Sequence, residues 1–195
     1  MFLLLCLFLN QGMQMYPSHN MKKSCQRIFS ISLLLFVLSA QVFAQKGNST
    51  TIILIRHAEK DTSAAGSTMM QADPPLSKVG KLRAEKLVSA LQEYPIQAIH
   101  STRFNRTRST VIPISVKISV GIQLYDPAKQ AEFAQILKLQ KNSTILVVGH
   151  SNTIPNLVNL LTGTSQYANL DDNEYDKIFI VTLKDGKALV EQMVY

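Results

Sequence analysis

Two aliphatic segments of strand length each run directly into a histidine, and this repeated pattern constrains the fold more than any other feature. The first, Thr51–Ile55, is followed by an arginine and His57, and the second, Thr144–Val148, by a glycine and His150. A continuous aliphatic run of this length is typical of a strand covered on both faces. The pattern therefore predicts a sheet between two helical layers, with a histidine at the end of two core strands.

Helical spacing of apolar residues predicts the elements that cover this sheet. Ser77 is expected to cap a helix that ends before Pro95 and whose apolar residues recur at three- and four-residue spacing, namely Val79, Leu82, Leu87, Val88 and Leu91. A second helix is expected over Arg103–Val111, stopped by Pro113 because proline cannot donate a backbone hydrogen bond. The others are Ala128–Leu139, with Phe133, Ile136 and Leu137 facing inward, and a helix with Ile154, Leu157, Val158 and Leu161 facing inward, closed by Gly163.

Further strands are predicted between and after these helices. They are Ala98–Ser101, a weaker extended run over Ile118–Tyr125, and a hairpin that turns at Asp185-Gly186. Strands that alternate with helices predict a mainly parallel sheet. The expected fold is thus α/β, a three-layer α/β/α sandwich whose mainly parallel sheet ends in an antiparallel edge hairpin.

The first 44 residues are predicted to be a secretory signal peptide. From Met21 the sequence has a basic start, the apolar stretch Ile28–Ala40 and a small-residue pattern ending at Ala44. Because Met21 begins a complete signal, residues 1–20 are compatible with an upstream start that is not used. Neither the stretch Ile28–Ala40 nor the N-terminal apolar run "MFLLLCLFLN" reaches the ~20 residues that span a bilayer, so export is favoured over a membrane anchor. We expect one domain, 45–195, periplasmic or extracellular and without a stable anchor after cleavage.

Removal of this leader excludes some kinds of catalytic and metal site from the domain. Both cysteines, Cys6 and Cys25, lie in the leader, which leaves neither thiol chemistry nor cysteine-based zinc sites. The net charge falls from +7 to +4, since Lys22, Lys23 and Arg27 are the only charged residues removed. This modest positive charge fits small anionic substrates. Nucleic-acid binding is not expected, because no basic run has interleaved aromatic residues.

The two histidines are expected to meet, because ligands bind in open α/β sheets at the carboxyl ends of the strands. His100 lies inside a predicted strand, where a hydrogen-bonded structural role is expected. The segment His100–Thr110 carries three arginines, and helical geometry cannot point all of them in one direction. One of them, near the helix start, would face the crevice.

Histidines and arginines together form a pocket suited to a tetrahedral dianion such as phosphate. Guanidinium groups match phosphate oxygens bidentately, and imidazolium adds a charge-assisted donor. A neutral histidine beside such a cationic cradle can act as the nucleophile itself. No carboxylate cluster suited to a metal accompanies these residues, so neither a metal nor another cofactor is expected.

The segments "LIRHAEK", "LSKVGKLRAEKLVSAL", "HSTRFNRTRST" and "ILVVGHSNTIP" resemble, in this order, the histidine phosphatase superfamily of phosphoglycerate mutase-like enzymes. The resemblance implies a metal-independent phosphohydrolase with a phosphohistidine intermediate, acting on a small phosphorylated substrate or a phosphoprotein. Ala58 replaces the family's usual glycine. The implied roles are Arg56 and Arg106 as phosphate clamps, His57 as the nucleophile, His150 as a ligand of a phosphoryl oxygen and Asn152 as a phosphate contact.

The sequence offers more than one candidate for the proton donor and more than one reaction type. Asp126 precedes a helix between Arg106 and His150, where many family members place an acid, and Glu59 and Glu132 are its rivals. A non-catalytic binder of phosphorylated ligands, a mutase-type phosphotransferase and a metal-dependent hydrolase are the other readings. The acidic segment Asp171–Asp176 is expected to be a solvated loop. Substrate specificity is expected to reside in the loops Asp61–Pro75 and Gln166–Asp176.

Overall fold

The computed structural model describes residues 49–62 and 73–195, so the predicted signal peptide lies outside the described residues. No helix in these ranges is long and apolar enough to cross a membrane. The strands are β1 Ser49–Arg56, β2 Ala98–Ser101, β3 Ile122–Leu124, β4 Thr144–Gly149, β5 Lys177–Lys184 and β6 Lys187–Val194. The helices are α3 Lys78–Ala90, α4 Asn105–Ile118, α5 Gln130–Leu139 and α6 Thr153–Thr162.

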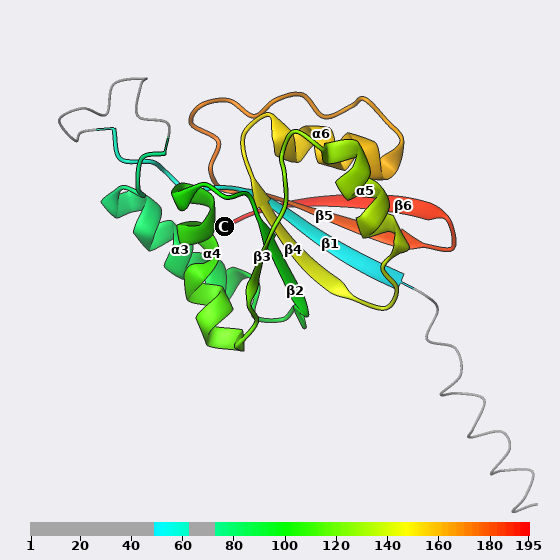
Figure 1. Cartoon of the computed structure of the whole chain (residues 1–195), viewed down its shortest axis with the longest axis horizontal. Helices are drawn as coiled ribbons and strands as arrows, with labels where there is room; N and C mark the ends of the chain where they lie inside the picture. Colours follow the sequence, from blue (N-terminus) through cyan, green and yellow to red (C-terminus); the bar gives the residue numbers. More distant parts are fainter. Residues whose placement is uncertain (1–48, 63–72) are drawn as a thin grey trace, which may run out of the picture. The chain divides into compact units, whose positions relative to one another are not determined.

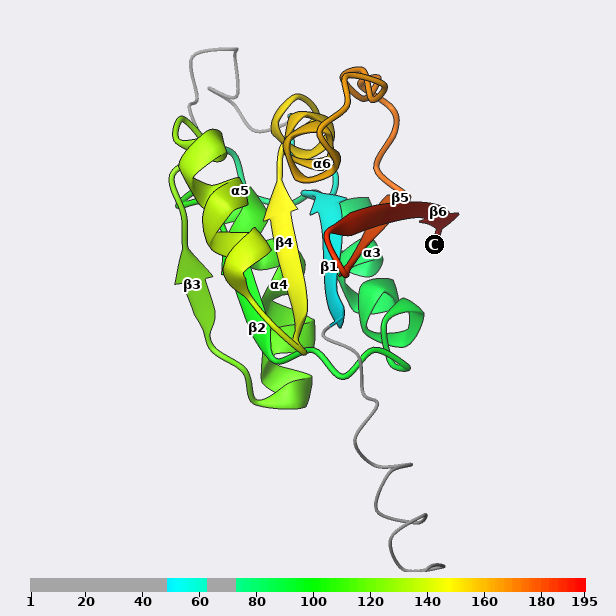
Figure 2. The same cartoon turned by 90° about the vertical axis from the view of Figure 1, so that its right-hand side faces the viewer.

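The strands form one six-stranded sheet in the order β3-β2-β4-β1-β5-β6. The first four are mutually parallel, and β5 and β6 add an antiparallel edge. Helices α3 and α4 cover one face of the sheet, and α5 and α6 cover the other (Figures 1 and 2). The predicted three-layer α/β/α sandwich is therefore confirmed.

Strand β1 contributes to both cores of the sandwich, because successive side chains of a strand point to opposite faces. Ile52 and Leu54 pack with the α5 and α6 side, whereas Ile53 and Ile55 pack with the α3 and α4 side. Every residue of its parallel neighbour β4 is buried as well. The two aliphatic runs are thus the central strands that the sequence predicts, and they hold their carboxyl ends rigidly.

The predicted apolar stripe of helix α3 is buried in its second half but not in its first. Ser77 caps the helix as expected, with its Oγ accepting the Gly80 N–H at 3.0 Å. Leu87 and Leu91 are buried as predicted, whereas Val79 and Leu82 are 58% and 66% exposed. The first turns bury the small residues Gly80 and Ala84 instead, and at Gly80 the helix approaches the backbone of Glu59, just after β1, too closely for a larger side chain.

Helix α4 continues through Pro113, which was expected to stop it, and ends beyond Ile118 at Ser119. A proline removes one backbone hydrogen bond of the helix, and the buried side chains of Val111 and Ile114 on either side keep the helix packed. Ser119 adopts the left-handed conformation that closes many helices. The extended run is accordingly shorter than predicted and begins after this helix.

The remaining elements differ little from their predictions. On α5, Ala134 is buried in place of Ile136, which is 53% exposed. Gly163 closes α6 with a positive φ of 72°. Asp185 and Gly186 form the hairpin turn, with φ of 50° and 76° as a two-residue turn with both φ positive requires.

Replacing Gly80 with alanine is expected to lower the free energy of unfolding by about 2 kcal/mol, because the added Cβ would collide with the backbone of Glu59. The matched variant Gly121→Ala has open space around the new methyl group and should change stability by less than about 0.5 kcal/mol. Urea denaturation of both variants measures the difference. Equal stability of the two would contradict the close packing of α3.

Candidate active site

The parallel pairing of β1 with β4 brings the two predicted histidines together. Arg56 lies opposite Gly149 in the register, and the next backbone N–H, that of His57, donates to the Gly149 carbonyl at 2.9 Å. The rings of His57 and His150 then lie edge to face, with centroids 5.4 Å apart and planes inclined by 68°. Both imidazoles therefore share one site at the carboxyl edge of the sheet.

His57 is held as a neutral imidazole with one defined tautomer. The side chain is 5% exposed, and its Nδ1 lies 2.8 Å from the Ala58 carbonyl oxygen. A carbonyl can only accept, so Nδ1 carries the proton and Nε2 carries the lone pair. Burial lowers the pKa of His57 to about 3, although the bond to Ala58 opposes the shift, and the nearby His150 and arginines lower it further. The Nε2 lone pair is thus available at neutral pH.

His150 has the opposite tautomer. Its Nδ1 lies 3.5 Å from Nη2 of Arg106, which can only donate, so the proton resides on Nε2. Nε2 in turn lies 3.1 Å from Oγ1 of Thr102, and that hydroxyl lies 2.8 Å from Oγ1 of Thr107. Burial lowers the pKa of His150 to about 4, and the charges of the two arginines add to the effect. Its orientation is fixed through two buried hydroxyls.

Arg106 reaches the site from the first turn of α4. Its Nη1 lies 3.4 Å from Oδ1 of Asp73, and its guanidinium lies 4.5 Å from the ring centre of Phe104. The carboxylate of Asp73 also accepts the Asn105 N–H at the start of the helix. The structure brings Arg106, but not the exposed Arg103, against His150.

Arg56 is only 5% exposed, and its guanidinium is held by hydrogen bonds from Nη1. Its Nη1 donates to the backbone carbonyls of Asp171, Asp172 and Glu174 at 2.7, 3.3 and 3.1 Å. The ring of Tyr175 lies against the guanidinium at 4.0 Å. The Nε atom, in contrast, is buried without a hydrogen-bond partner among the described residues. A buried donor in this position suits an anionic ligand.

The acidic segment Asp171–Asp176 is only partly the solvated loop that was expected. The side chains of Asp171 and Asp172 are exposed, as expected of a solvated loop. The backbone carbonyls of the segment, however, bind Arg56, and Tyr175 lies beside both Arg56 and His57. Backbone carbonyls leave no trace in residue type, which is why sequence reasoning missed this role.

Three fully buried threonines were also missed. Besides Thr102 and Thr107, Thr110 accepts the Ala58 N–H at 2.9 Å and donates to the Arg106 carbonyl at 2.8 Å. Thr107 and Thr110 are spaced as one helix face, which a polar residue rarely occupies toward a core. That spacing was the available sequence signal.

The predicted proton donors have polar partners other than the two histidines. Asp126 accepts the Ala128 N–H at 2.9 Å and lines a pocket of about 330 Å³ that Glu132 also borders. No hydrogen bond, ion pair or ring contact joins Asp126 to His57 or His150 in the part of the chain described. Glu59 forms a bidentate ion pair with Arg83. Burial by itself would raise the pKa of Glu59, but the hydrogen bonds and charge of Arg83 outweigh this and lower it.

Two further residues were singled out from the sequence, Asn152 and His100. The first lies just after β4, and the second lies within β2. Asn152 is the exposed N-cap residue of α6, two positions after His150, and its side chain makes no capping hydrogen bond. His100 is half-buried in β2 and packs edge-on against Phe133 at 5.3 Å, while burial lowers its pKa. The roles of Asn152 and Asp126 stay predictions.

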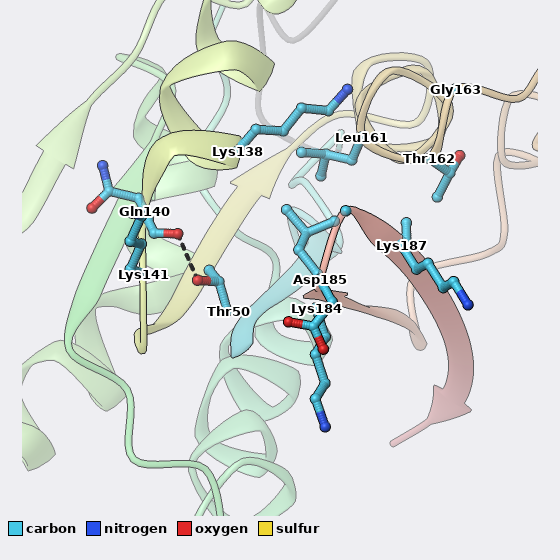
Figure 3. A pocket seen from close by; sticks show the side chains of 13 residues that line it. Thr50, Lys138, Gln140, Lys141, Leu161, Thr162, Gly163, Lys184, Asp185 and Lys187 are labelled. Atoms are coloured by element: carbon cyan, nitrogen blue, oxygen red, sulfur yellow. Dashed lines mark hydrogen bonds between the residues drawn. The ribbon is translucent and has the colours of Figure 1, made fainter. Parts of the chain in front are cut away.

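Another pocket, of about 510 Å³, lies where β1 begins, at the end of the strand opposite to His57 (Figure 3). Thr50 and four lysines contribute to its lining. Figure 3 shows that Lys138, Lys184 and Lys187 extend in different directions rather than toward one point. None of the predicted site residues lines this pocket. Across residues 49–62 and 73–195, no group of three or more His, Cys, Asp or Glu side chains is placed to hold a metal ion.

Comparison with known proteins supports the fold. Residues 52–129, which include Arg56, His57 and Arg106, match the sequence model of the histidine phosphatase superfamily (branch 1). Curated proteins give no match. Among solved structures, the protein histidine phosphatase SixA complexed with tungstate is 18% identical, with a TM-score of 0.60 over 74% of this chain and 96% of that one.

Two further solved structures have the same fold. Phosphoserine phosphatase from Entamoeba histolytica, in complex with 3-phosphoglyceric acid, is 17% identical, with a TM-score of 0.59 over 75% of this chain and 97% of that one. Phosphoglycerate mutase from Plasmodium falciparum is 18% identical, with a TM-score of 0.54 over 75% and 91%. The chain therefore has the phosphoglycerate mutase-like fold.

The stability of the protein is expected to fall as the pH drops below about 6.5, where His57 begins to bind a proton in the unfolded chain. Folded His57 binds one only near its pKa of about 3. Between these values the unfolded chain holds more protons, so the free energy of unfolding decreases by up to about 1.4 kcal/mol per pH unit for this group. Urea denaturation at about pH 7, 6 and 5 measures the slope.

The variant His57→Gln should have a shallower slope, whereas the exposed, non-titrating variant Gln135→Ala should keep the parent slope. Identical slopes for His57→Gln and the parent would show that His57 is not the depressed group.

Proposed function

We propose that the chain belongs to the histidine phosphatase superfamily and is a metal-independent phosphohydrolase that forms a phosphohistidine on His57. One observation carries the proposal. His57 is buried, neutral and oriented by Ala58 so that Nε2 keeps its lone pair, and the charges of Arg56 and Arg106 and the ring of His150 lie beside it. The Nε2–H of His150 is bonded to Thr102, so His150 becomes a donor to the phosphate when the bound dianion favours protonation of Nδ1. The superfamily match to residues 52–129 agrees with this assignment.

In the proposed first step, Nε2 of His57 attacks the phosphorus in line with the leaving oxygen. The N–P bond forms as the P–O bond breaks, and the electron pair of that bond departs with the oxygen. Arg56, Arg106 and His150 stabilise the charge on the remaining phosphoryl oxygens, which is where phosphoryl transfer needs positive charge. Water then attacks phosphorus, breaks the N–P bond and releases inorganic phosphate.

The tautomers support this division of roles. The Ala58 carbonyl accepts from Nδ1 of His57, so it stabilises the positive charge that the ring gains once Nε2 bonds to phosphorus. Thr102 and Thr107 hold the His150 ring at the edge of the pocket. The Nε of Arg56, buried without a partner among the described residues, is a donor for a phosphoryl oxygen.

Asp126 is the proposed general acid, protonating the leaving oxygen. It lies two residues after the end of β3, whose carboxyl end is at the same edge of the sheet as those of β1 and β4. Glu59 is a weaker candidate, because its pairing with Arg83 keeps it ionised at neutral pH. Asn152, at the start of α6, is proposed to contact the phosphate from the far side of His150.

The cellular setting is a separate part of the proposal. Residues 1–44 carry the basic, apolar and small-residue regions of a signal peptide, and we propose that the domain acts after export, in the periplasm or outside the cell. A small phosphorylated molecule or a phosphoprotein is the proposed substrate.

Replacing His57 with asparagine is expected to reduce the turnover of p-nitrophenyl phosphate by at least about 10³-fold and to abolish a phosphoenzyme trapped by acid quench, because Nε2 forms the covalent bond. His100→Asn, in strand β2, which pairs with β4 and not with β1, should retain both. Turnover should be unchanged in excess chelator. Equal activity of His57→Asn and the parent would reject covalent catalysis, and binding of inorganic phosphate without turnover would indicate a non-catalytic binder.

Substituting Asp126 by asparagine should lower kcat on an alkyl phosphate by about 10²- to 10⁴-fold and have a much smaller effect on p-nitrophenyl phosphate, whose leaving group needs no proton. Glu59→Gln and Glu132→Gln are matched controls and should leave the ratio of the two rates near that of the parent. Should Glu59→Gln instead produce the selective loss, Glu59 would be the acid.

A further inference from the structure

Two aromatic rings border the histidine pair, one beside each of the proposed phosphate-binding arginines. The Tyr175 ring lies 4.0 Å from the Arg56 guanidinium and 6.2 Å from the His57 ring. The Phe104 ring lies 4.5 Å from the Arg106 guanidinium and 5.1 Å, edge to face, from the His150 ring. Both aromatic side chains are only half-buried, so part of each ring is open to a ligand.

Core packing does not explain either ring. Other half-buried tyrosines of the chain, Tyr94 and Tyr167, pack against the two hydrophobic clusters of the sandwich, whereas Phe104 and Tyr175 belong to neither. Phe104 also occupies the N-cap of α4, where Ser, Thr, Asp or Asn is preferred, and it makes no capping hydrogen bond. The helix start is served instead by the carboxylate of Asp73.

The charges at the rim favour a leaving group without a negative charge of its own. Asp73 lies 3.4 Å from Arg106, with 36% of its side chain exposed. Asp171 and Asp172, whose backbone carbonyls bind Arg56, also have exposed side chains. A carboxylate next to the ester bond would be repelled by these groups. A neutral, planar group would instead contact the ring faces.

We propose that this site is selective for phosphate esters whose leaving group carries an aromatic ring, with Phe104 and Tyr175 as the residues that determine this specificity. The inference rests on the proposed phosphatase activity of the same site. The N–P bond to His57 forms as the ester P–O bond breaks, and the aromatic alcohol leaves with that oxygen and one proton. The arginines bind the phosphoryl group, and the rings contact the part of the substrate that departs.

Benzyl phosphate and cyclohexylmethyl phosphate test this selectivity, because both release a primary alcohol of similar size and differ mainly in ring planarity. The parent protein is expected to favour benzyl phosphate by roughly tenfold in kcat/KM, since an aromatic contact adds a modest factor for each ring. Phe104→Leu and Tyr175→Leu should each reduce the preference several-fold, mainly through KM. Tyr175→Phe should keep the preference.

Tyr94→Leu is the matched control, since Tyr94 lies against the core away from the site, and it should leave the preference unchanged. Equal kcat/KM for the two esters in the parent, or an unchanged preference in both leucine variants, would overturn the inference while leaving the phosphatase assignment intact. If neither ester is hydrolysed while p-nitrophenyl phosphate is, the inference fails and the proposed function stands. If p-nitrophenyl phosphate is not hydrolysed either, the proposed function fails. Calorimetry with benzylphosphonate and cyclohexylmethylphosphonate then decides the inference, and equal Kd values overturn it.

Discussion

The parallel pairing of β1 with β4 is the constraint on which the rest of the site depends. Arg56 lies opposite Gly149, so the residue after each strand is a histidine at the same height of the sheet. A slip of one residue would turn every side chain of one strand to the opposite face. Gly149 is required at this point, because a Cβ there would lie 2.7 Å from the Tyr125 hydroxyl and 2.8 Å from Oγ1 of Thr153.

Concentrating cationic residues at this edge has an electrostatic consequence. With Arg56 and Arg106 nearby and little water around the rings, His57 and His150 are kept neutral. The Nη1 of Arg56 donates to backbone carbonyls. Unprotonated imidazoles avoid repulsion with the two guanidinium charges. A bound dianion would remove that repulsion, so ligand binding and protonation of His150 are coupled.

Residue patterns predicted the elements whose burial depends on aliphatic side chains, and failed where small residues or backbone atoms decide. The aliphatic runs around Ile53 and Val147 predicted central strands. The positions of His57 and His150 were then predicted from the carboxyl ends of those strands. The exposure of Val79 and Leu82 escaped prediction because Gly80 allows α3 to approach Glu59 in a way that apolar periodicity does not express. The anchoring of Arg56 escaped it because carbonyl groups are common to all residues.

The buried threonines of α4 show what the site requires of the fold. Threonine is a poor helix former, and a buried hydroxyl needs a partner. Thr110 links the backbone after His57 to the first turn that carries Arg106, and Thr107 supports the hydroxyl that orients His150. One helix start thus positions a backbone amide, a guanidinium and an imidazole relative to one another. Aliphatic residues at those two positions would leave the Ala58 N–H without its acceptor and the Thr102 hydroxyl, which bonds His150, without its Thr107 partner. The threonines are therefore explained by the site rather than by the core.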